Sequence, residues 1–244
     1  MVSIDGLTKS YGRLTAVADV SLSIRKGEVL ALIGPNGSGK TTLFECIAGL
    51  LPYEAGTISM NGRTLTSRER ASRIFYVPDA IAPWSAQTVR WALDFTLGFF
   101  GRSETKARIA AQRDEVVQRM DLGPLLGSPI GTLSKGQRKR VVLAVGMLTP
   151  HPLLLADEPF DGLDLRQTRE VGAALRAHAA TGRTLFLSIH QINDAARVCD
   201  RFVLLSAGRV RGEGTLEQLA ARVAPSTPSL PSTPSLEEIF LALT

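Results

Sequence analysis

Cysteine is scarce in this sequence, with only Cys46 and Cys199 among 244 residues. The two lie far apart, and neither belongs to a Cys-x-x-Cys pair or to a cluster with the spacing of metal ligands. A disulfide framework and a cysteine-based metal site are therefore not expected. We expect buried, reduced thiols of the kind found in cytosolic proteins.

Long hydrophobic runs are missing as well. The opening residues MVSIDGLTKSYG lack the apolar core of a signal peptide. No apolar run reaches the roughly 18 residues that a membrane span requires. We therefore expect a chain that is soluble by itself and takes part in membrane processes only through a partner.

The sequence contains no heptad run and no basic arm with interleaved aromatic residues. These absences argue against an inserted coiled coil and against a nucleic-acid-binding surface. The formal net charge of +5 is compatible with nucleotides, nucleic acids or membrane surfaces and does not choose among them. The length suits one large domain, or one domain with a subdomain.

What the sequence does contain is an alternation of short apolar strands with helical segments. The strand patterns cover residues 2–7, 16–24, 28–34, 56–60, 74–78, 153–157 and 184–189, with a hairpin over 201–214. The helical patterns cover residues 40–50, two segments within 88–120, and residues 134–148, 165–180 and 191–198. This order predicts an α/β fold with a mixed sheet, an N-terminal antiparallel β region and an inserted helical subdomain at about 80–150.

The end of the chain differs in composition. The hexapeptide PSTPSL occurs twice in tandem within residues 225–236. Proline and serine at this density cannot form a packed element, so residues 223–235 are predicted to be an extended linker after a domain over 1–222. Residues 236–244 then follow the apolar spacing of a short helix, capped by Ser235 and Glu238. Its apolar stripe must dock on the parent domain or on a second subunit.

The segment GPNGSGKTT matches the G-x-x-x-x-G-K-[ST] pattern between a predicted strand and a predicted helix. Its backbone N–H groups and the helix N-terminus are suited to bind phosphates, with Lys40 reaching the β and γ oxygens and Thr41 ligating Mg²⁺. An ordinary glycine-rich turn is the alternative, but all four fixed positions of the pattern are filled. A P-loop NTPase core is therefore predicted, and its ATP contacts are Gly34, Pro35, Asn36, Gly37, Ser38, Gly39, Lys40, Thr41 and Thr42.

The segment LLLADEP, residues 153–159, supplies a second half to this site. Its apolar residues predict a buried strand, and Asp157 lies at the carboxyl end, where open α/β sheets bind ligands. Asp157 is suited to hold Mg²⁺ and Glu158 to orient or deprotonate the attacking water. A solvated acidic turn is the alternative, which the neighbouring phosphate loop makes less attractive.

The segment TLSKGQRKR, residues 132–140, predicts a helix start with an unusual charge. Ser134 and Gln137 have capping-box spacing, yet the first turns carry four basic residues and no acid. The positive end of a helix dipole prefers an anion nearby, by roughly 0.3–1 kcal/mol. We therefore predict that this helix N-terminus binds an anion supplied from elsewhere. The alternative is that its basic residues form only a solvated face.

The motifs GPNGSGKTT, LSKGQ, LLLADEP, GLD and a lone histidine after an apolar strand occur in the order typical of one family. In this respect the chain resembles the nucleotide-binding subunit of an ATP-binding cassette (ABC) transporter over roughly residues 2–214. The resemblance implies that Tyr11 stacks on adenine, that Asp164 belongs to the D-loop and that His190 is the switch histidine. A surface aromatic, a helix N-cap and a core histidine are the respective alternatives.

The resemblance also implies which anion the basic helix expects. In the family two cassettes face each other head to tail, and the signature helix of one points at the γ-phosphate held by the other. Ser134, Lys135, Gly136 and Gln137 would then contact ATP in a second subunit, with a homodimer favoured. Lys135 replaces a glycine of the commoner L-S-G-G-Q sequence, and we expect function to survive this change.

A larger departure from the family lies at YVPD, residues 76–79. Asp79 stands where the family usually places a glutamine that touches Mg²⁺ and the attacking water. A carboxylate is still a hard oxygen ligand for Mg²⁺, but it adds repulsion near the γ-phosphate. We expect Asp79 to act as a catalytic residue and as a metal ligand beside Thr41 and Asp157.

Seven of the fourteen aromatic residues lie between Phe75 and Phe100. Trp91, Phe95 and Phe99 follow helical spacing and predict the core of the helical subdomain or a groove for a short helix of a membrane subunit. The two interpretations are compatible, with Trp84 at the rim of the groove.

By this resemblance the chain is the ATP-hydrolysing subunit of a transporter, with ATP and Mg²⁺ as cofactors. It would lie on the cytoplasmic face of the membrane, bound to a separate multi-span permease. Export is favoured over import because the closing SLEEIFLALT resembles the last helix of bacterial efflux cassettes. The alternatives are a soluble ABC-type ATPase of translation or DNA repair and a non-catalytic nucleotide binder, which Glu158 and His190 disfavour.

Overall fold

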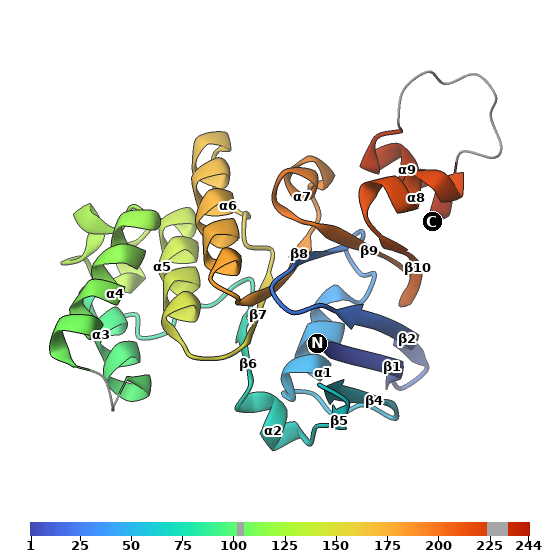
Figure 1. Cartoon of the computed structure of the whole chain (residues 1–244), viewed down its shortest axis with the longest axis horizontal. Coiled ribbons are helices and arrows are strands. Elements are labelled where there is room, and N and C mark those ends of the chain that lie inside the picture. Colours follow the sequence, from blue (N-terminus) through green and yellow to red (C-terminus); the bar gives the residue numbers. More distant parts are fainter. Residues whose placement is uncertain (102–104, 224–233) are drawn as a thin grey trace.

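The computed structural model describes residues 1–101, 105–223 and 234–244. Figure 1 shows an antiparallel sheet beside a larger mixed sheet, with the helices of the middle of the chain gathered at one end. The α/β class and the mixed sheet predicted from the sequence are confirmed.

The antiparallel sheet comprises β1 (Val2–Tyr11), β2 (Leu14–Ile24), β4 (Ala55–Met60) and β5 (Arg63–Thr64), in the order β2-β1-β4-β5. Strand β1 is longer than the predicted residues 2–7, because it continues to the β1–β2 turn. Ile4 on β1 is paired with Leu22 on one side and Ile58 on the other, and all three are buried. One face of the sheet therefore contributes to the core.

The mixed sheet comprises β3 (Val29–Ile33), β6 (Ile74–Val77), β7 (Leu153–Asp157), β8 (Thr184–Ile189), β9 (Arg201–Ser206) and β10 (Arg209–Gly214), in the order β10-β9-β3-β8-β7-β6. Only β10 runs antiparallel to its neighbour, and it follows β9 through a tight turn in which Ala207 and Gly208 both have positive φ. Strands β3, β7 and β8 are parallel, so the segments that follow them meet at one edge of the sheet.

Alternate residues of the buried strands pack into two cores on opposite faces of the sheet. Leu30 and Leu32 of β3 join the core under the antiparallel sheet, together with Phe44 of α1 (Lys40–Ala48). Ala31 and Ile33 face the core that includes α6 (Leu165–Ala180) and α7 (Ile192–Val198). This alternation is the period of two that a strand covered on both faces requires.

The helical subdomain contains α3 (Val89–Phe100), α4 (Lys106–Arg119), the short 3-10 helices η1 (Gly123–Leu125) and η2 (Ile130–Thr132), and α5 (Lys135–Leu148). Helix α5 is buried along most of its length and packs against both α3 and α4. It also contacts β6 and β7, so it connects the subdomain to the edge of the mixed sheet. The five-residue helix α2 (Ser67–Ala71) lies between β5 and β6.

The chain closes with α8 (Leu216–Val223) and α9 (Leu236–Leu243). Most of the predicted proline-rich linker lies at 224–233, outside the described residues. Leu236 and Ile239 of α9 are buried, and α9 contacts α7 and α8 of the same chain (Figure 1). The apolar stripe therefore docks on its own domain, which the sequence had left open against a second subunit. Within the described residues, no helix combines the length and apolarity needed to cross a membrane.

Candidate functional site

The loop between β3 and α1 is shaped by glycines. Gly39 caps α1 with φ near +103°, and a Cβ there would lie 2.2 Å from the carbonyl oxygen of Ala16. A Cβ on Gly34 would likewise lie 2.4 Å from the carbonyl oxygen of Leu205. Side chains are thus excluded at both ends of the loop. The first turn of α1 carries no acidic residue, so its positive dipole end remains available to an anion.

Lys40 folds back over this loop. Its Nζ donates to the carbonyl oxygens of Gly34 at 2.8 Å and Pro35 at 3.3 Å, and it lies 3.5 Å from Oε1 of Glu158. The side chain is buried, so its charge is concentrated on the loop. Carbonyl partners exchange readily for phosphate oxygens, which is the role predicted for this lysine.

Asp157 at the end of β7 is held by hydroxyl groups from three directions. Thr41 Oγ1 lies 2.7 Å from Oδ2, the Tyr76 hydroxyl donates to the same oxygen at 3.4 Å, and the Ser188 hydroxyl donates to Oδ1. Burial, with the nearby Asp157 charge, raises the pKa of Tyr76, so this hydroxyl stays a donor. Tyr76 and Ser188 were not predicted from the sequence, because only the pairing of β6 and β8 with β7 brings them here.

The oxygen atoms of Thr41 and Asp157 fit Mg²⁺. This ion prefers hard oxygen ligands and commonly takes one or two from the protein and the rest from water and phosphate. Among the described residues, no group of three or more His, Cys, Asp or Glu side chains is placed to hold a metal ion.

Glu158 and His190 meet beside Lys40. His190 Nδ1 lies 2.5 Å from Glu158 Oε2, and the backbone N–H of His190 donates to the same oxygen at 3.3 Å. Glu158 has φ near +48°, and its N–H donates to the Ser188 hydroxyl at 3.0 Å. Because a left-handed conformation is costly for a glutamate, the surrounding bonds fix where its carboxylate points. The structure thus joins two residues that are 32 positions apart in sequence.

A cavity of about 390 Å³ lies over the glycine loop and Glu158. Its lining includes Tyr11 and Leu14 beside the β1–β2 turn, residues of the glycine loop, and the acidic residues Asp79, Asp157 and Glu158. Tyr11 is half exposed, as a ring that stacks on a base must be, and Lys9 Nζ lies 5.4 Å from the ring centroid. Leu14 was missed by the sequence analysis. Its only signal in the sequence was an apolar residue three positions after Tyr11.

The signature helix lies outside this cavity. The predicted capping box is present, with the Gln137 N–H donating to Ser134 Oγ at 3.2 Å, but no residue from 134 to 137 lines the cavity among the described residues. Lys135, expected to add charge toward a nucleotide, forms an ion pair with Asp161 of its own chain. Through that bond Lys135 lowers the pKa of Asp161.

Gly136 packs against residues 162–163, in the segment that the resemblance assigns to the D-loop. A Cβ at this position would lie 2.5 Å from the carbonyl oxygen of Gly162, so only glycine fits so close to this loop. Asp164 caps α6 and accepts from the Gln167 N–H at 2.8 Å. The N-cap alternative for Asp164 is therefore present in the structure, and it is compatible with the predicted D-loop role.

Asp79 lines the cavity, but its carboxylate already has a partner. Lys139 Nζ, on α5, lies 2.9 Å from Asp79 Oδ1 and 2.8 Å from the Asp79 carbonyl oxygen. The sequence showed Lys139 only as one of four basic residues in the first turns of the helix. Its partner is 60 positions away, so no local pattern could reveal the pair. Ligation of Mg²⁺ by Asp79 stays a prediction.

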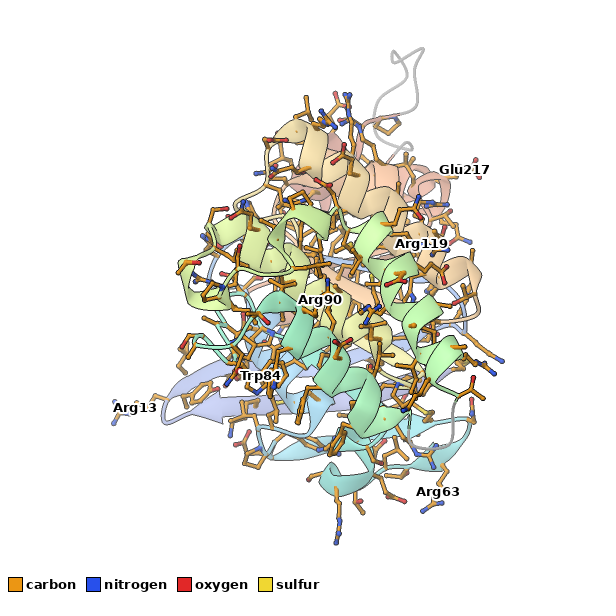
Figure 2. All side chains as sticks on the ribbon, turned by 90° about the vertical axis from the view of Figure 1, so that its left-hand side faces the viewer. Arg13, Arg63, Trp84, Arg90, Arg119 and Glu217 are labelled. Carbon is orange, nitrogen blue, oxygen red and sulfur yellow. The ribbon has the colours of Figure 1, made fainter. Side chains whose placement is uncertain are left out.

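The aromatic residues of α3 lie at the surface. Trp91, Phe95 and Phe99 are 37, 45 and 54% exposed, whereas Ala92, Leu93 and Leu97 form the buried face. Trp91 and Phe95 stack with centroids 4.9 Å apart, and both contact Trp84 edge-on. Figure 2 shows Trp84 where the subdomain adjoins the rest of the chain. The interpretation of this stripe as subdomain core is wrong, because these three side chains are exposed.

Comparison with known proteins agrees with this geometry. The model of the ABC transporter family matches residues 17–161, which include the glycine loop, the signature helix and Asp157. The chain belongs to this family. It is therefore an ABC ATP-binding subunit, and such subunits are ATPases.

Two relatives and one solved structure illustrate the range of this ABC cassette. It is 36% identical over 222 residues to the sulfate/thiosulfate import ATP-binding protein CysA of Caulobacter vibrioides, covering 89% of this chain and 66% of the relative. It is 28% identical over 243 residues to the linearmycin resistance ATP-binding protein LnrL of Bacillus subtilis, covering 99% of this chain and 78% of the relative. An ATP-binding subunit of an ABC transporter superposes with a TM-score of 0.86 at 28% identity, covering 100% of this chain and 99% of that one.

Proposed function

We propose that this cassette powers transport through a separate multi-span membrane permease, as a head-to-tail homodimer that holds MgATP between its subunits. The observation that carries the proposal is the division of the site. The glycine loop, Asp157 and Glu158 line one cavity, and His190 contacts Glu158, while residues 134–137 at the start of the signature helix are not among the described residues that line it. We infer that each cavity is completed by the helix N-terminus of a second copy. The first turn of that helix carries no acidic residue, so the nucleotide provides an anion for the helix dipole.

In this arrangement each residue has a distinct task. The loop N–H groups, Lys40 and the N-terminus of α1 bind the phosphates, while Thr41 and Asp157 hold Mg²⁺, which neutralises phosphate charge. Glu158 orients the attacking water and accepts its proton, and His190 fixes the Glu158 carboxylate through the 2.5 Å contact. Tyr11 supports the base. Ser134, Lys135, Gly136 and Gln137 face the nucleotide of the partner, for which Lys135 must exchange Asp161 for phosphate.

The permease is proposed to dock on the aromatic surface formed by Trp84, Trp91, Phe95 and Phe99. Exposed aromatic rings in mutual contact are typical of the centre of a protein interface. The surface adjoins the loop that contains Asp79 and the subdomain that contains α5, so it is placed to couple nucleotide state to a membrane subunit. Through this partner the chain would reside on the cytoplasmic face of the membrane.

The direction of transport is proposed to be export. The relatives include both an import and a resistance ATP-binding protein. The match to LnrL extends over 243 residues, against 222 for CysA, so only the former spans nearly the whole chain. This supports the efflux type that the last helix suggested. A role in translation or DNA repair is the alternative, and no nucleic-acid partner is proposed.

Affinity purification of the tagged chain from detergent-solubilised membranes tests the transport proposal. We expect a multi-span membrane protein to be recovered with the chain, and to be lost when Phe95 is replaced by serine while ATP binding persists. Recovery with ribosomes or DNA instead would contradict the proposal. Uptake or efflux assays in vesicles that contain the recovered complex then decide the direction.

A further inference from the structure

Lys139 occupies a junction between three parts of the molecule. It lies on α5, only 4% of its surface is exposed, and its Nζ has three oxygen neighbours. These are Asp79 Oδ1 at 2.9 Å, the Asp79 carbonyl oxygen at 2.8 Å and the Asp157 carbonyl oxygen at 3.3 Å. An ammonium group has three N–H donors, so this contact set uses its full capacity.

The two members of the Lys139–Asp79 pair differ in burial, because the Lys139 side chain is buried and that of Asp79 is 38% exposed. A lysine buried without a partner is unstable in its charged form, and Asp79 is the acid that reaches it. Asp79 also lines the cavity that contains Lys40, Asp157 and Glu158. Without Lys139, its carboxylate would add a third negative charge to a wall that must accept a triphosphate.

The Lys139–Asp79 pair also lies between two cavities. Asp79 belongs to the nucleotide cavity and to a second cavity of about 380 Å³, which Lys139, Lys135 and Val142 of α5 line from the other side. The ammonium group therefore joins the loop after β6 to the carboxyl end of β7 from within α5. Helix α5 begins at the signature motif and carries Lys139. Through this lysine it fixes the loop after β6 relative to the Asp157–Glu158 turn.

We propose that Lys139 is a positioning residue of the MgATP site, which neutralises Asp79 and fastens its loop to the end of β7. The aspartate at the usual glutamine position is thus compensated inside the chain by a lysine. In this arrangement Mg²⁺ is left to Thr41 and Asp157, and Asp79 acts through Lys139. The inference rests on the proposed MgATP site and is independent of the permease and of the direction of transport.

Second-site suppression tests this inference in the full-length chain. Binding of a fluorescent ATP analogue in excess Mg²⁺ is measured for Lys139→Gln, for Asp79→Asn and for the double variant. We expect Lys139→Gln to raise the Kd about tenfold or more, because an unpaired carboxylate then faces the phosphates. Asp79→Asn and the double variant should both bind within about threefold of wild type, because neither leaves a carboxylate unpaired. In Asp79→Asn the Lys139 ammonium keeps the two backbone carbonyl oxygens and can donate to the amide oxygen of the new side chain. ATPase kinetics should show the Lys139→Gln defect mainly in KM.

Arg140→Gln is the matched control. Arg140 is the next residue of α5 and is also buried. It pairs with Asp121 at a distance of 3.2 Å, and neither residue lines the nucleotide cavity among the described residues. Any change in Kd caused by Arg140→Gln should not be relieved when Asp79→Asn is added. Circular dichroism and thermal unfolding establish that each variant is folded. If Lys139→Gln does not fold, a folded double variant with near wild-type affinity supports the pairing, and an unfolded double variant overturns it.

Two results would overturn the role of Lys139 in a folded protein. One is wild-type affinity in Lys139→Gln, and the other is a Lys139→Gln defect that Asp79→Asn does not relieve. A shift in the Mg²⁺ concentration that half-saturates Asp79→Asn, relative to wild type, would show direct ligation by Asp79. This result would overturn the assignment of Mg²⁺ to Thr41 and Asp157 alone. Failure of the wild-type chain to bind MgATP would refute the nucleotide site itself, so the two failures are distinguishable.

Discussion

Glu158 is the residue on which turnover depends most directly in this account. Its left-handed backbone, the 2.5 Å contact to His190 and the 3.5 Å approach of Lys40 hold a carboxylate at the edge of the cavity. Glu158→Gln keeps the shape and removes the proton acceptor. We expect hydrolysis to fall by about 100-fold or more while ATP still binds and a dimer accumulates. Phosphate release and size-exclusion chromatography measure both effects, and unchanged hydrolysis would assign the base elsewhere.

His178 provides a prediction that concerns stability. Burial, together with the charges of Arg183 and Arg119, lowers its pKa to about 4. Its unfolded value is about 6.5. Below pH 6.5 the unfolded chain therefore binds a proton that the folded chain refuses, so stability falls as the pH drops toward 4. His178→Gln removes this penalty, so its effect on the free energy of unfolding should be more favourable at pH 5 than at pH 7.5 by about 1–2 kcal/mol. Urea unfolding at both pH values measures this, and an equal difference at the two would contradict it.

Individual residues differ in how far the sequence could place them. Lys40, Thr41, Asp157 and Glu158 were predictable because local spacing fixes their positions at the ends of strands and helices. The Lys139–Asp79 and Lys135–Asp161 pairs were not, because each joins residues 60 or 26 positions apart in the sequence. Opposite charges occur in many combinations along a chain, and only the folded backbone selects which of them meet.

Among the helices and strands, those with a strong apolar period were predictable. Strands β3, β7 and β8 are continuous buried runs, and α5 begins at its capping box as expected. Helix α2 was missed because its five residues carry no apolar stripe and depend on the Thr66–Glu69 capping box. The aromatic face of α3 was ambiguous because helical spacing does not reveal which side meets the core. Its buried face consists instead of smaller apolar residues such as Ala92 and Leu93.

The docking of α9 on its own domain yields a further prediction. Ile239 is fully buried against α7 and α8, whereas Leu241 on the same helix is 72% exposed. Ile239→Ala should lower the free energy of unfolding by about 2–4 kcal/mol, because it opens a cavity in the core. Leu241→Ala should change it by less than about 0.5 kcal/mol. Chemical denaturation compares the two variants. Equal effects would mean that α9 does not pack on this domain in solution.

At the scale of the whole molecule, the proposed function requires two half-sites that do not share a cavity. The cavity at the carboxyl ends of β3 and β7 contains the phosphate loop and the acidic pair, and the N-terminus of α5 presents the signature motif elsewhere. The fold keeps these halves in fixed relation through α5, which packs on β6 and β7 as well as on α3 and α4. Helix α5 thus packs both on the edge of the mixed sheet and on α3, the helix that carries the aromatic surface.

The most direct test of this account mixes two inactive variants. Lys40→Ala removes the phosphate lysine, and Ser134→Arg blocks the signature helix, so neither variant alone has an intact composite site. If each site takes one half from each subunit, an equimolar mixture should recover about a quarter of wild-type ATPase activity, because half of the dimers are mixed and each has one complete site. Continued inactivity of the mixture, with undiminished hydrolysis by wild-type monomer at every dilution, would contradict the account.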